Sequence, residues 1–360
     1  IFSSNRAARF FKLPARIHFW LFIGFILFGL ATGRAYYVLH KDKFLTIGNP
    51  VLKALPAYEL LFSGWGQTRL RLEAPLPEHP PFAENKRKSI LFIVADSVQF
   101  KSVRPDTMPF LHALRKRRPG LKSDYHYSTA HYTEPGIFSL VTGLDGFHYQ
   151  PYASAEAPVF SLKQLRDSGF RLHAFASTQI RSWHAAEFFF DQFDDYREFV
   201  KHERFDRDDA DLARALMEFA GSKREHPFFM LAVLNSSHHN YPYPPEFEHF
   251  KPAVPENFDI DRIREHNEWD ALRNRYYNSL RYIDSLLEQI LVAFESQIAA
   301  GELIVVFTSD HGEEFNERGL WGHIKINPYN EQMRVPLYFY LPGAAAPPQR
   351  LTSSSDIMPT

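Results

Sequence analysis

Two stretches of sequence decide the fold: SILFIVAD at residues 89–96 and ELIVVFTSD at residues 302–310. Both are short apolar runs rich in β-branched residues, and both end in polar residues that are typical of turns. Strands that are buried on both faces read as continuous apolar runs, whereas a sheet with one wet face alternates apolar and polar residues. Three further runs have this buried-strand character: RLHAFAS (171–177), PFFMLAVL (227–234) and VPLYFYL (335–341).

Helical patterns lie between these runs. Residues 208–220 begin with an Asp pair that we expect to cap a helix. Residues 274–295 carry apolar side chains at helical spacing, namely Leu280, Ile283, Leu287, Ile290 and Phe294. Because strands alternate with helices, the sequence predicts an α/β fold with a mostly parallel central sheet flanked by helices.

Composition excludes several classes of protein. The chain has 360 residues, of which 45% are hydrophobic and 23% charged, so it is not a disordered chain. Its net charge is −1, from 41 basic and 42 acidic residues, so there is no overall attraction for nucleic acid and we expect no nucleic-acid partner. The chain has no cysteine, which excludes disulfides, thiolate-bound zinc, iron–sulfur clusters and a cysteine nucleophile.

An apolar segment near the N-terminus predicts a transmembrane helix. IHFWLFIGFILFGLATG at residues 17–33 has seventeen consecutive residues without a formal charge, close to the minimum for a membrane span. Trp20, Tyr36 and Tyr37 stand where interfacial aromatic residues usually lie. A buried core helix and the apolar core of a signal peptide remain the alternatives. Four basic residues precede the segment and place the N-terminus in the cytoplasm by the positive-inside tendency: Arg6, Arg9, Lys12 and Arg16.

These features divide the chain into three parts. Residues 1–40 hold the cytoplasmic basic flank and the transmembrane helix, and residues 41–88 are a proline-rich juxtamembrane linker. Residues 89–360 form the α/β domain, which we expect to lie outside the membrane. The chain starts at Ile1 without a Met and stops abruptly after SSSDIMPT at residues 353–360, so we expect it to be a fragment of a longer polypeptide.

Acidic residues and a histidine stand at the exits of two predicted strands. Asp96 ends the first run, and Asp310 ends the fourth and is followed by His311. Ligands of parallel sheets bind at the carboxyl ends of the strands, where two carboxylates and an imidazole make a plausible site for a divalent metal. Each residue taken alone is also compatible with a turn or a helix cap.

A hydroxyl at a helix start adds a third element. In STAHYTEPGIFSLVTGL, at residues 128–144, Thr133 precedes Glu134, Pro135 and Gly136, which predicts Thr133 as an N-cap with proline in the first helical turn. A hydroxyl in this position faces free backbone N–H groups and the positive end of the helix dipole, which suits attack on phosphate or sulfate. Because its pKa is too high for unaided attack, it needs a metal or a base.

Together these elements resemble the alkaline phosphatase and sulfatase superfamily. The narrower resemblance is to its membrane-anchored branch: phosphoethanolamine transferases, lipoteichoic acid synthases and envelope proteins that modify or regulate lipopolysaccharide. It covers residues 89–360, and DHGEEFNERGLWGH at residues 310–323 is its most specific part. The closing SSSDIMPT resembles the D-I-x-P-T segment of the family, which normally continues into further sequence.

The resemblance implies roles for individual residues. It makes Asp96, Thr133, Asp310 and His311 the ligands of a divalent metal, Zn²⁺ or Mn²⁺, with Thr133 also the nucleophile. One further residue, His323, matches a family histidine near the transferred group.

Other matches concern the leaving group and the substrate. In SSHHNYPYPP one of His238 and His239 matches a second family histidine, and the spacing favours His238. These histidines would bind a second metal, protonate a leaving group or orient phosphate oxygens. Trp183 resembles a tryptophan that lines the substrate pocket of lipoteichoic acid synthases, and Arg181 would substitute for an arginine that this chain lacks at Ala185.

Departures from the family separate its subfamilies. The C/S-x-P-x-R motif that classical sulfatases modify is absent, because Thr133 to Ile137 stand there. The first ligand is Asp96, where the transferases usually have Glu. Regulatory members have often lost the Asp-His pair that this chain keeps at Asp310 and His311, which favours catalysis.

The predicted function is therefore a membrane-anchored, metal-dependent phosphotransferase. It would move a phospholipid headgroup, phosphoethanolamine or phosphoglycerol, onto an envelope glycan or lipid. The implied location is the inner (plasma) membrane, with the catalytic domain periplasmic or extracellular. Two alternatives stay open: a phosphodiesterase or phosphatase that uses the same chemistry with water as acceptor, and a non-catalytic lipid-binding or lipopolysaccharide-regulating protein.

Overall fold

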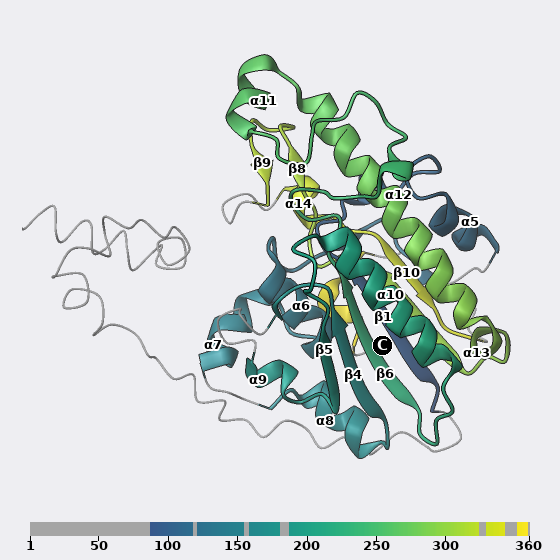
Figure 1. Cartoon of the computed structure of the whole chain (residues 1–360). Helices are drawn as coiled ribbons and strands as arrows, with labels where there is room; N and C mark the ends of the chain where they lie inside the picture. The colour runs from purple at the N-terminus through teal and green to yellow at the C-terminus, as the bar shows by residue number, and fades with distance from the viewer. Residues whose placement is uncertain are drawn as a thin grey trace, which may run out of the picture. The chain divides into compact units, whose positions relative to one another are not determined.

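In the computed structural model the central sheet has seven strands in the order β2-β10-β7-β1-β6-β4-β5 (Figure 1). Strand β1 lies in the middle and pairs in parallel with β6 and β7. Parallel pairing continues from β6 to β4 and from β4 to β5. The predicted α/β fold with a mostly parallel central sheet is confirmed. The strands are β1 (Ser89–Ala95), β2 (Leu121–Lys122), β4 (Arg171–Ala176), β5 (Asp195–Glu198), β6 (Phe228–Leu234), β7 (Leu303–Thr308) and β10 (Leu337–Tyr340).

Strand β10 runs antiparallel to both of its neighbours, β7 and β2. A parallel return from β7 would need a crossover, usually a helix, that carries the chain back to the other end of the sheet. The described part of the connection holds only α14 (Asn330–Met333) and the short antiparallel pair β8 (Glu314–Phe315) and β9 (Trp321–Gly322). The chain therefore re-enters the sheet from the edge at which it left. The apolar run at 335–341 predicted this strand but carried no information on its direction.

Both faces of the sheet are buried, as the continuous apolar runs predict. Along β1 the side chains alternate between two cores: Leu91 and Ile93 pack on one side, and Phe92 and Val94 on the other. The first core includes side chains of α5, α10, α12 and α13, and the second includes side chains of α6, α7, α8 and α9. The helices thus form a layer on each face (Figure 1).

The helices of the first layer are α5 (Pro109–Arg117), α10 (Phe205–Gly221), α12 (Trp269–Ala293) and α13 (Glu295–Ala299). Those of the second layer are α6 (Thr133–Thr142), α7 (Tyr149–Ser154), α8 (Phe160–Asp167) and α9 (Glu187–Phe190). The remaining elements are α11 (Ile260–His266), the strand pair β3 (His126–Tyr127) and β11 (Thr352–Ser353), and the 3-10 turns η2 (Phe100–Ser102), η3 (Gly146–His148), η5 (Pro245–Phe247) and η6 (Ser354–Asp356).

The helix predicted at 208–220 begins earlier than its sequence signal. It starts at Phe205, so Asp208 and Asp209 lie inside its first turns and the predicted Asp cap was wrong. Asp208 still accepts hydrogen bonds from backbone N–H groups of the preceding loop, from Lys201 (2.9 Å) and His202 (3.2 Å). Asp209 instead accepts hydrogen bonds from the segments that follow β4 and β6.

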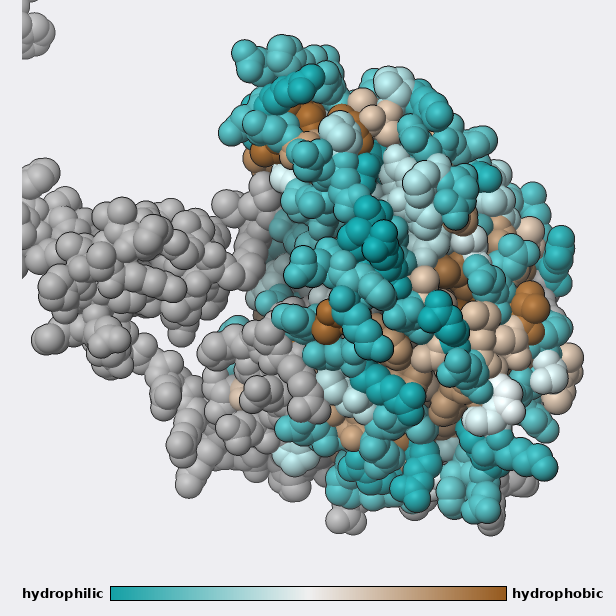
Figure 2. Space-filling view, in the orientation of Figure 1, coloured by the Kyte–Doolittle hydropathy of each residue, from teal (hydrophilic) through white to brown (hydrophobic). Residues whose placement is uncertain are grey.

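The helix predicted at 274–295 extends from Trp269 to Ala293. The five apolar residues that predicted it, from Leu280 to Phe294, are all completely buried against the sheet. The outer surface of α10 and α12 is mostly hydrophilic in Figure 2, as expected for helices that bury one face.

The structure describes six stretches of chain: 87–117, 121–154, 158–180, 187–323, 329–342 and 351–358. The predicted transmembrane segment at 17–33 and the linker up to residue 86 lie outside these ranges, as do Arg181 and Trp183. Within the described ranges, no helix combines the length and the apolar character needed to cross a membrane.

Candidate metal centre

Three chain segments bring four predicted ligands together at the carboxyl edge of the sheet. Asp96 follows β1 directly, Asp310 and His311 follow β7, and Thr133 is the first residue of α6. Three of the side chains are almost completely buried, and Thr133 is 8% exposed. Since β1 and β7 are parallel neighbours, their exits necessarily lie side by side.

The imidazole of His311 lies at the centre of the group. Its Nε2 atom is 3.2 Å from Thr133 Oγ1, 3.5 Å from Asp96 Oδ1 and 3.5 Å from Asp310 Oδ2. The Thr133 hydroxyl also lies 3.3 Å from Asp96 Oδ2, to which it donates. Donor atoms of Asp96, Asp310 and His311 all lie within 4.8 Å of one another, a spacing that one metal ion can bridge.

Thr133 occupies a slightly different helical position from the one predicted. The N-cap of α6 is Tyr132, and Thr133 is the first helical residue, so its hydroxyl does not cap the helix. Its Oγ1 atom is instead turned toward Asp96 and His311. The N-cap prediction was therefore wrong by one residue, because the Thr-x-Pro pattern marks the first turn but does not distinguish its first two positions.

Gly136 allows the start of α6 to lie against the Asp310 loop. A Cβ atom at this position would be 2.8 Å from the Asp310 carbonyl oxygen and 3.0 Å from the Asp310 Cβ atom. Such distances are too short for a side chain, so only glycine fits without moving the helix. The glycine brings the Thr133 hydroxyl and the Asp310 carboxylate to one site.

Ser97 is a site residue that the sequence analysis missed. Its φ angle of 62° lies in the left-handed region, which costs a non-glycine residue of order 1 kcal/mol or more. In this conformation its hydroxyl donates to Asp96 Oδ1 (2.6 Å), and its backbone N–H donates to Asp310 Oδ1 (3.2 Å). Tyr276 fixes the turn by donating its hydroxyl to the Ser97 carbonyl (2.9 Å). Ser97 therefore orients both carboxylates.

The hydrogen bonding of His311 leaves one ring nitrogen free for a ligand. Its Nδ1 atom lies 2.8 Å from the carbonyl oxygen of Gly312, which can only accept. We therefore assign the proton to Nδ1, so Nε2 presents its lone pair to Thr133 and the two carboxylates. A histidine whose far nitrogen donates to a carbonyl is typical of metal ligands.

The electrostatics of the two carboxylates fit a bound cation. Burial and, after it, the negative charge of Asp96 raise the pKa of Asp310 well above its usual range. Burial also opposes ionisation of Asp96, but the positive charge that the nearby His238, His311 and His323 carry when protonated outweighs it and lowers the pKa of Asp96. Asp310 Oδ2 is buried and accepts no hydrogen bond. Two carboxylates, a hydroxyl and an imidazole therefore fit one divalent metal ion, which would satisfy the unpartnered oxygen.

Two further predicted residues lie beside this group. The ring of His323 is centred 4.3 Å from that of His311, and the ring of His238 is 5.2 Å from that of His323. His239 points elsewhere: its ring packs against Trp321 at 4.9 Å and Phe258 at 5.2 Å. Of the two neighbouring histidines, His238 is therefore the one on the side of the site.

Glu313 orients His323 and was not singled out from the sequence. Its carboxylate is completely buried, with Oε1 3.2 Å from His323 Nδ1 and Oε2 accepting from the Tyr241 hydroxyl at 3.1 Å. Trp321 in turn donates to the Tyr241 oxygen (3.1 Å). With Nδ1 facing a carboxylate, Nε2 of His323 is left for other partners. The signal for Glu313 was its place in the DHGEEF stretch, two residues after the candidate ligand His311.

A family model described as Sulfatase matches residues 88–360. The chain belongs to the sulfatase family. This confirms the resemblance drawn from the DHGEEF stretch and the two strand exits, at the level of the family.

Curated proteins whose names give two different chemistries are similar to this chain. Iduronate 2-sulfatase of Mus musculus is 29% identical over 155 residues, which are 34% of this chain and 28% of that protein. Phosphoethanolamine transferase EptA of Salmonella typhimurium is 29% identical over 102 residues, which are 28% of this chain and 18% of that protein. Both relatives are enzymes by name. The chain spans less than a third of the length of these curated relatives.

A solved structure supports the fold. The crystal structure of the C-terminal periplasmic domain of EptC from Escherichia coli, in complex with Zn, has a TM-score of 0.60 to this chain at 17% identity. The match covers 78% of this chain and 84% of that chain. At this level of identity the likeness shows a shared fold.

Proposed function

We propose that this sulfatase-family chain is a phosphotransferase in which Thr133 is the nucleophile and takes up a phospholipid headgroup. The observation that carries the proposal is the position of Thr133 Oγ1, which lies at the start of α6 and within 3.3 Å of both Asp96 and His311. A nucleophile needs an activating partner in contact with it, and this hydroxyl has two candidate metal ligands as neighbours.

Phosphoryl chemistry is favoured over sulfate-ester hydrolysis. Thr133 stands in place of the Cys or Ser that classical sulfatases modify, and Ile137 stands in place of the motif's Arg. Threonine retains a hydroxyl that can attack phosphorus directly. The similarity to EptA, a phosphoethanolamine transferase by name, supports the same choice.

We assign Asp96, Thr133, Asp310 and His311 as ligands of one divalent metal, Zn²⁺ or Mn²⁺. When bound, such an ion lowers the pKa of a hydroxyl and neutralises charge on phosphoryl oxygens. The mixture of oxygen donors and one imidazole suits either ion, and the zinc complex of the EptC domain supports zinc.

The transfer would proceed in two displacements at phosphorus. Thr133 Oγ1 gives its proton to Asp96 Oδ2, to which it already donates, and attacks the phosphodiester. A bond forms from Oγ1 to phosphorus, and the bond from phosphorus to the lipid oxygen breaks in line. His323 or His238 gives the leaving diacylglycerol oxygen its proton. The hydroxyl of the acceptor then attacks the phospho-threonine and loses its proton to the same imidazole. The bond from phosphorus to Thr133 Oγ1 breaks, and Oγ1 takes its proton back from Asp96. The free N–H groups at the start of α6 face the negative phosphoryl oxygens.

Donor and acceptor follow from the proposed location. We place the chain at the inner (plasma) membrane, anchored by residues 17–33, with the domain from residue 89 periplasmic or extracellular. Such an anchor confines the enzyme and a lipid donor to one surface. Phosphatidylethanolamine or phosphatidylglycerol would be the donor and an envelope glycan or lipid the acceptor, for which Trp183, Arg181 and His239 are candidate contacts.

Product analysis on phospholipid vesicles tests this function. The full chain with Zn²⁺ or Mn²⁺ is expected to convert phosphatidylethanolamine or phosphatidylglycerol into diacylglycerol and to attach the headgroup phosphate to an added glycan or lipid acceptor. Thr133→Ala is expected to lower the rate at saturating metal by at least about 1,000-fold, because the nucleophile and one of the four proposed metal ligands are lost, while the thermal unfolding temperature of the metal-free protein changes little. Thr133→Ser is the matched control that keeps a hydroxyl. Release of free headgroup phosphate would show a hydrolase instead, and full activity of Thr133→Ala would refute the nucleophile.

A further inference from the structure

A second buried carboxylate lies near the carboxyl edge of the sheet, on α10. Asp209 has no exposed surface and accepts four hydrogen bonds. Two come from backbone N–H groups, of Asn235 (2.9 Å) and Ser236 (2.8 Å). The other two come from the hydroxyls of Ser177 and Ser236. Nothing in the proposed transfer uses this residue, although the four donors converge on it.

The four donors belong to the exits of two strands. Ser177 follows β4 directly, and Asn235 and Ser236 follow β6. Asp209 therefore ties α10 to the point where β4 and β6 both end. Because β6 is the parallel neighbour of β1, this point lies beside the exit that carries Asp96.

The chain anchored by Asp209 leads directly to His238. A backbone turn closes with the N–H of His238 donating to the Asn235 carbonyl (3.0 Å), and the Tyr241 N–H donates to the His238 carbonyl (2.7 Å). Within this turn the Ser237 hydroxyl donates to the Asp96 carbonyl. One end of the turn is thus fixed to Asp209, its middle to Asp96, and its far end carries the imidazole beside His323.

The carboxylate is needed because the donors are buried. Removing its negative charge would leave buried N–H and O–H groups without an acceptor, and each unsatisfied group costs of the order of a hydrogen bond or more. Asparagine has the same shape, but it places an NH₂ group against donors and cannot accept all four bonds. The turn would then separate from α10.

We propose that Asp209, with Ser177 and Ser236, is a positioning residue that holds residues 235–241 so that His238 faces the metal centre. The proposal rests on the proposed function only for the chemical role of His238. The hydrogen bonds that attach the turn to Asp209 do not depend on which reaction the site performs.

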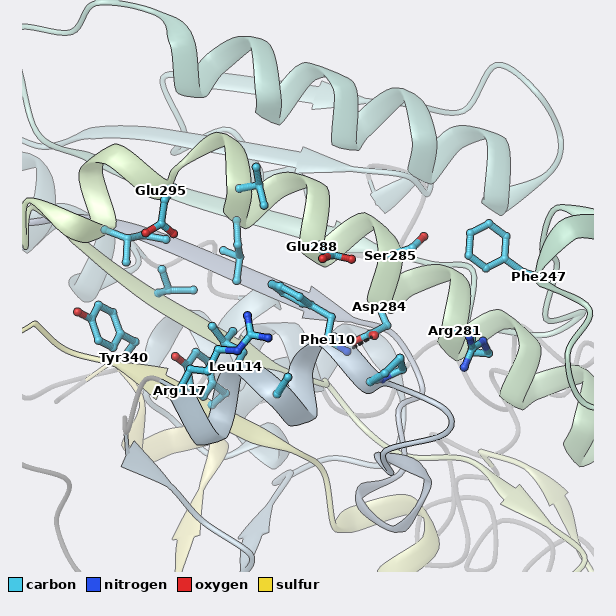
Figure 3. Close-up of a pocket in the computed structure, with 17 residues that line it drawn as sticks. Phe110, Leu114, Arg117, Phe247, Arg281, Asp284, Ser285, Glu288, Glu295 and Tyr340 are labelled. Carbon is cyan, nitrogen blue, oxygen red and sulfur yellow. Dashed lines mark hydrogen bonds between the residues drawn. The ribbon is translucent and has the colours of Figure 1, made fainter.

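Asp284 provides a matched control on the same face of the sheet. It is 2% exposed, lies on α12, and accepts the backbone N–H groups of Phe110 (2.7 Å) and Leu111 (2.9 Å) at the start of α5. Figure 3 shows its carboxylate turned toward Phe110, in a groove of about 550 Å³. None of the four proposed metal ligands lines this groove. Asp284 thus performs the same kind of anchoring away from the site.

The test compares Asp209→Asn and Asp284→Asn in the metal-loaded full chain. Hydrogen exchange is measured over residues 235–241, and turnover is measured with bis-p-nitrophenyl phosphate, a chromogenic phosphodiester. Asp209→Asn is expected to speed exchange in this segment and to lower kcat by about 100-fold, as His238→Ala does, with KM nearly unchanged. The kcat of the double variant Asp209→Asn/His238→Ala should lie within about twofold of that of His238→Ala, because both changes remove the same contribution, that of a correctly placed His238. Asp284→Asn should alter neither readout.

Four results would overturn the proposal or separate its two parts, the anchoring of the turn and the role of His238. Unchanged exchange and unchanged kcat in Asp209→Asn would overturn it, and so would an equal loss of kcat in Asp284→Asn. Faster exchange in Asp209→Asn, with full turnover in His238→Ala, would uphold the anchoring and refute the role of His238 in the proposed function. If Asp209→Asn does not fold, Ser236→Ala removes one of the four bonds, and wild-type exchange over 235–241 in that variant would overturn the proposal.

Discussion

Asp310 and Asp209 are both completely buried near the carboxyl edge of the sheet, yet their surroundings are opposite. Asp209 accepts four hydrogen bonds and has all its donors in place. Asp310 has one oxygen that accepts none, and the carboxylate of Asp96 lies nearby. A buried carboxylate saturated with donors holds chain segments together, whereas one with an open oxygen beside a second carboxylate is prepared for a cation.

The largest expected effect that separates the two residues is on metal binding. Asp310→Asn is expected to weaken Zn²⁺ or Mn²⁺ binding by at least about 100-fold, because a charged ligand is lost. In the metal-free protein the same change should not lower the free energy of unfolding, since it removes a carboxyl whose ionisation burial opposes. Asp209→Asn should have the opposite pattern. It should leave the affinity for the metal ion nearly unchanged and lower the free energy of unfolding. Calorimetric titration with metal and urea unfolding in chelator measure both quantities, and a destabilised metal-free Asp310→Asn would contradict the comparison.

The second prediction concerns how the stability of the fold depends on pH, through the anchoring carboxyl of Asp284. Burial raises the pKa of Asp284 to about 6, with Glu288 adding to the rise and Arg281 opposing it. A carboxyl with a raised pKa stabilises the fold fully below its ordinary value of 3.8 and loses that contribution as pH rises through about 6. The rise in the pKa of Asp284 from 3.8 to about 6 corresponds to a contribution of up to roughly 3 kcal/mol to the free energy of unfolding.

Urea unfolding of the wild type and Asp284→Asn at several pH values between 4.5 and 7.5 measures this contribution. The free energy of unfolding should fall with rising pH in the wild type, and the fall should be smaller in Asp284→Asn. Parallel curves for the two proteins would show that Asp284 titrates alike in the folded and unfolded states. The matched Glu288→Gln variant separates the small contribution of that neighbour.

The smallest expected effect concerns the orientation of His323. Glu313→Gln keeps the shape of the side chain but weakens its bond to His323 Nδ1. We expect kcat to fall by about 10- to 100-fold with KM little changed, because partners that orient an imidazole usually contribute this much. Gln99, which donates to the Glu313 backbone carbonyl, gives a control variant, Gln99→Met, that removes this bond without adding a charge or changing the Glu313 carboxylate. A wild-type kcat in Glu313→Gln would contradict the orienting role.

Much of this site could be predicted because its residues follow continuous apolar strands. Asp96, Asp310 and His311 stand at the ends of apolar runs that are typical of buried strands, and parallel strands bring their exits to one edge. Thr133 was recognised from its helix-start pattern and the family resemblance, although its position in the first turn was off by one residue.

Other parts of the molecule have no local signal. Strand β5 is short and polar, DYRE, at the edge of the sheet, so its sequence does not read as a strand. The Asp209 carboxylate looked like a helix cap because the segments it binds, after β4 and β6, are distant in sequence. Ser97 and Glu313 act through neighbours that only the folded chain brings close.

The most direct test of the central claim is to look for the covalent intermediate on Thr133. The full chain is mixed with Zn²⁺ or Mn²⁺ and vesicles of phosphatidylethanolamine and phosphatidylglycerol, quenched at short times and digested for mass analysis. The account predicts the added mass of phosphoethanolamine or phosphoglycerol on the peptide that contains Thr133, and no adduct in Thr133→Ala. Product formation with no adduct at any time, or an adduct on another residue, would contradict it.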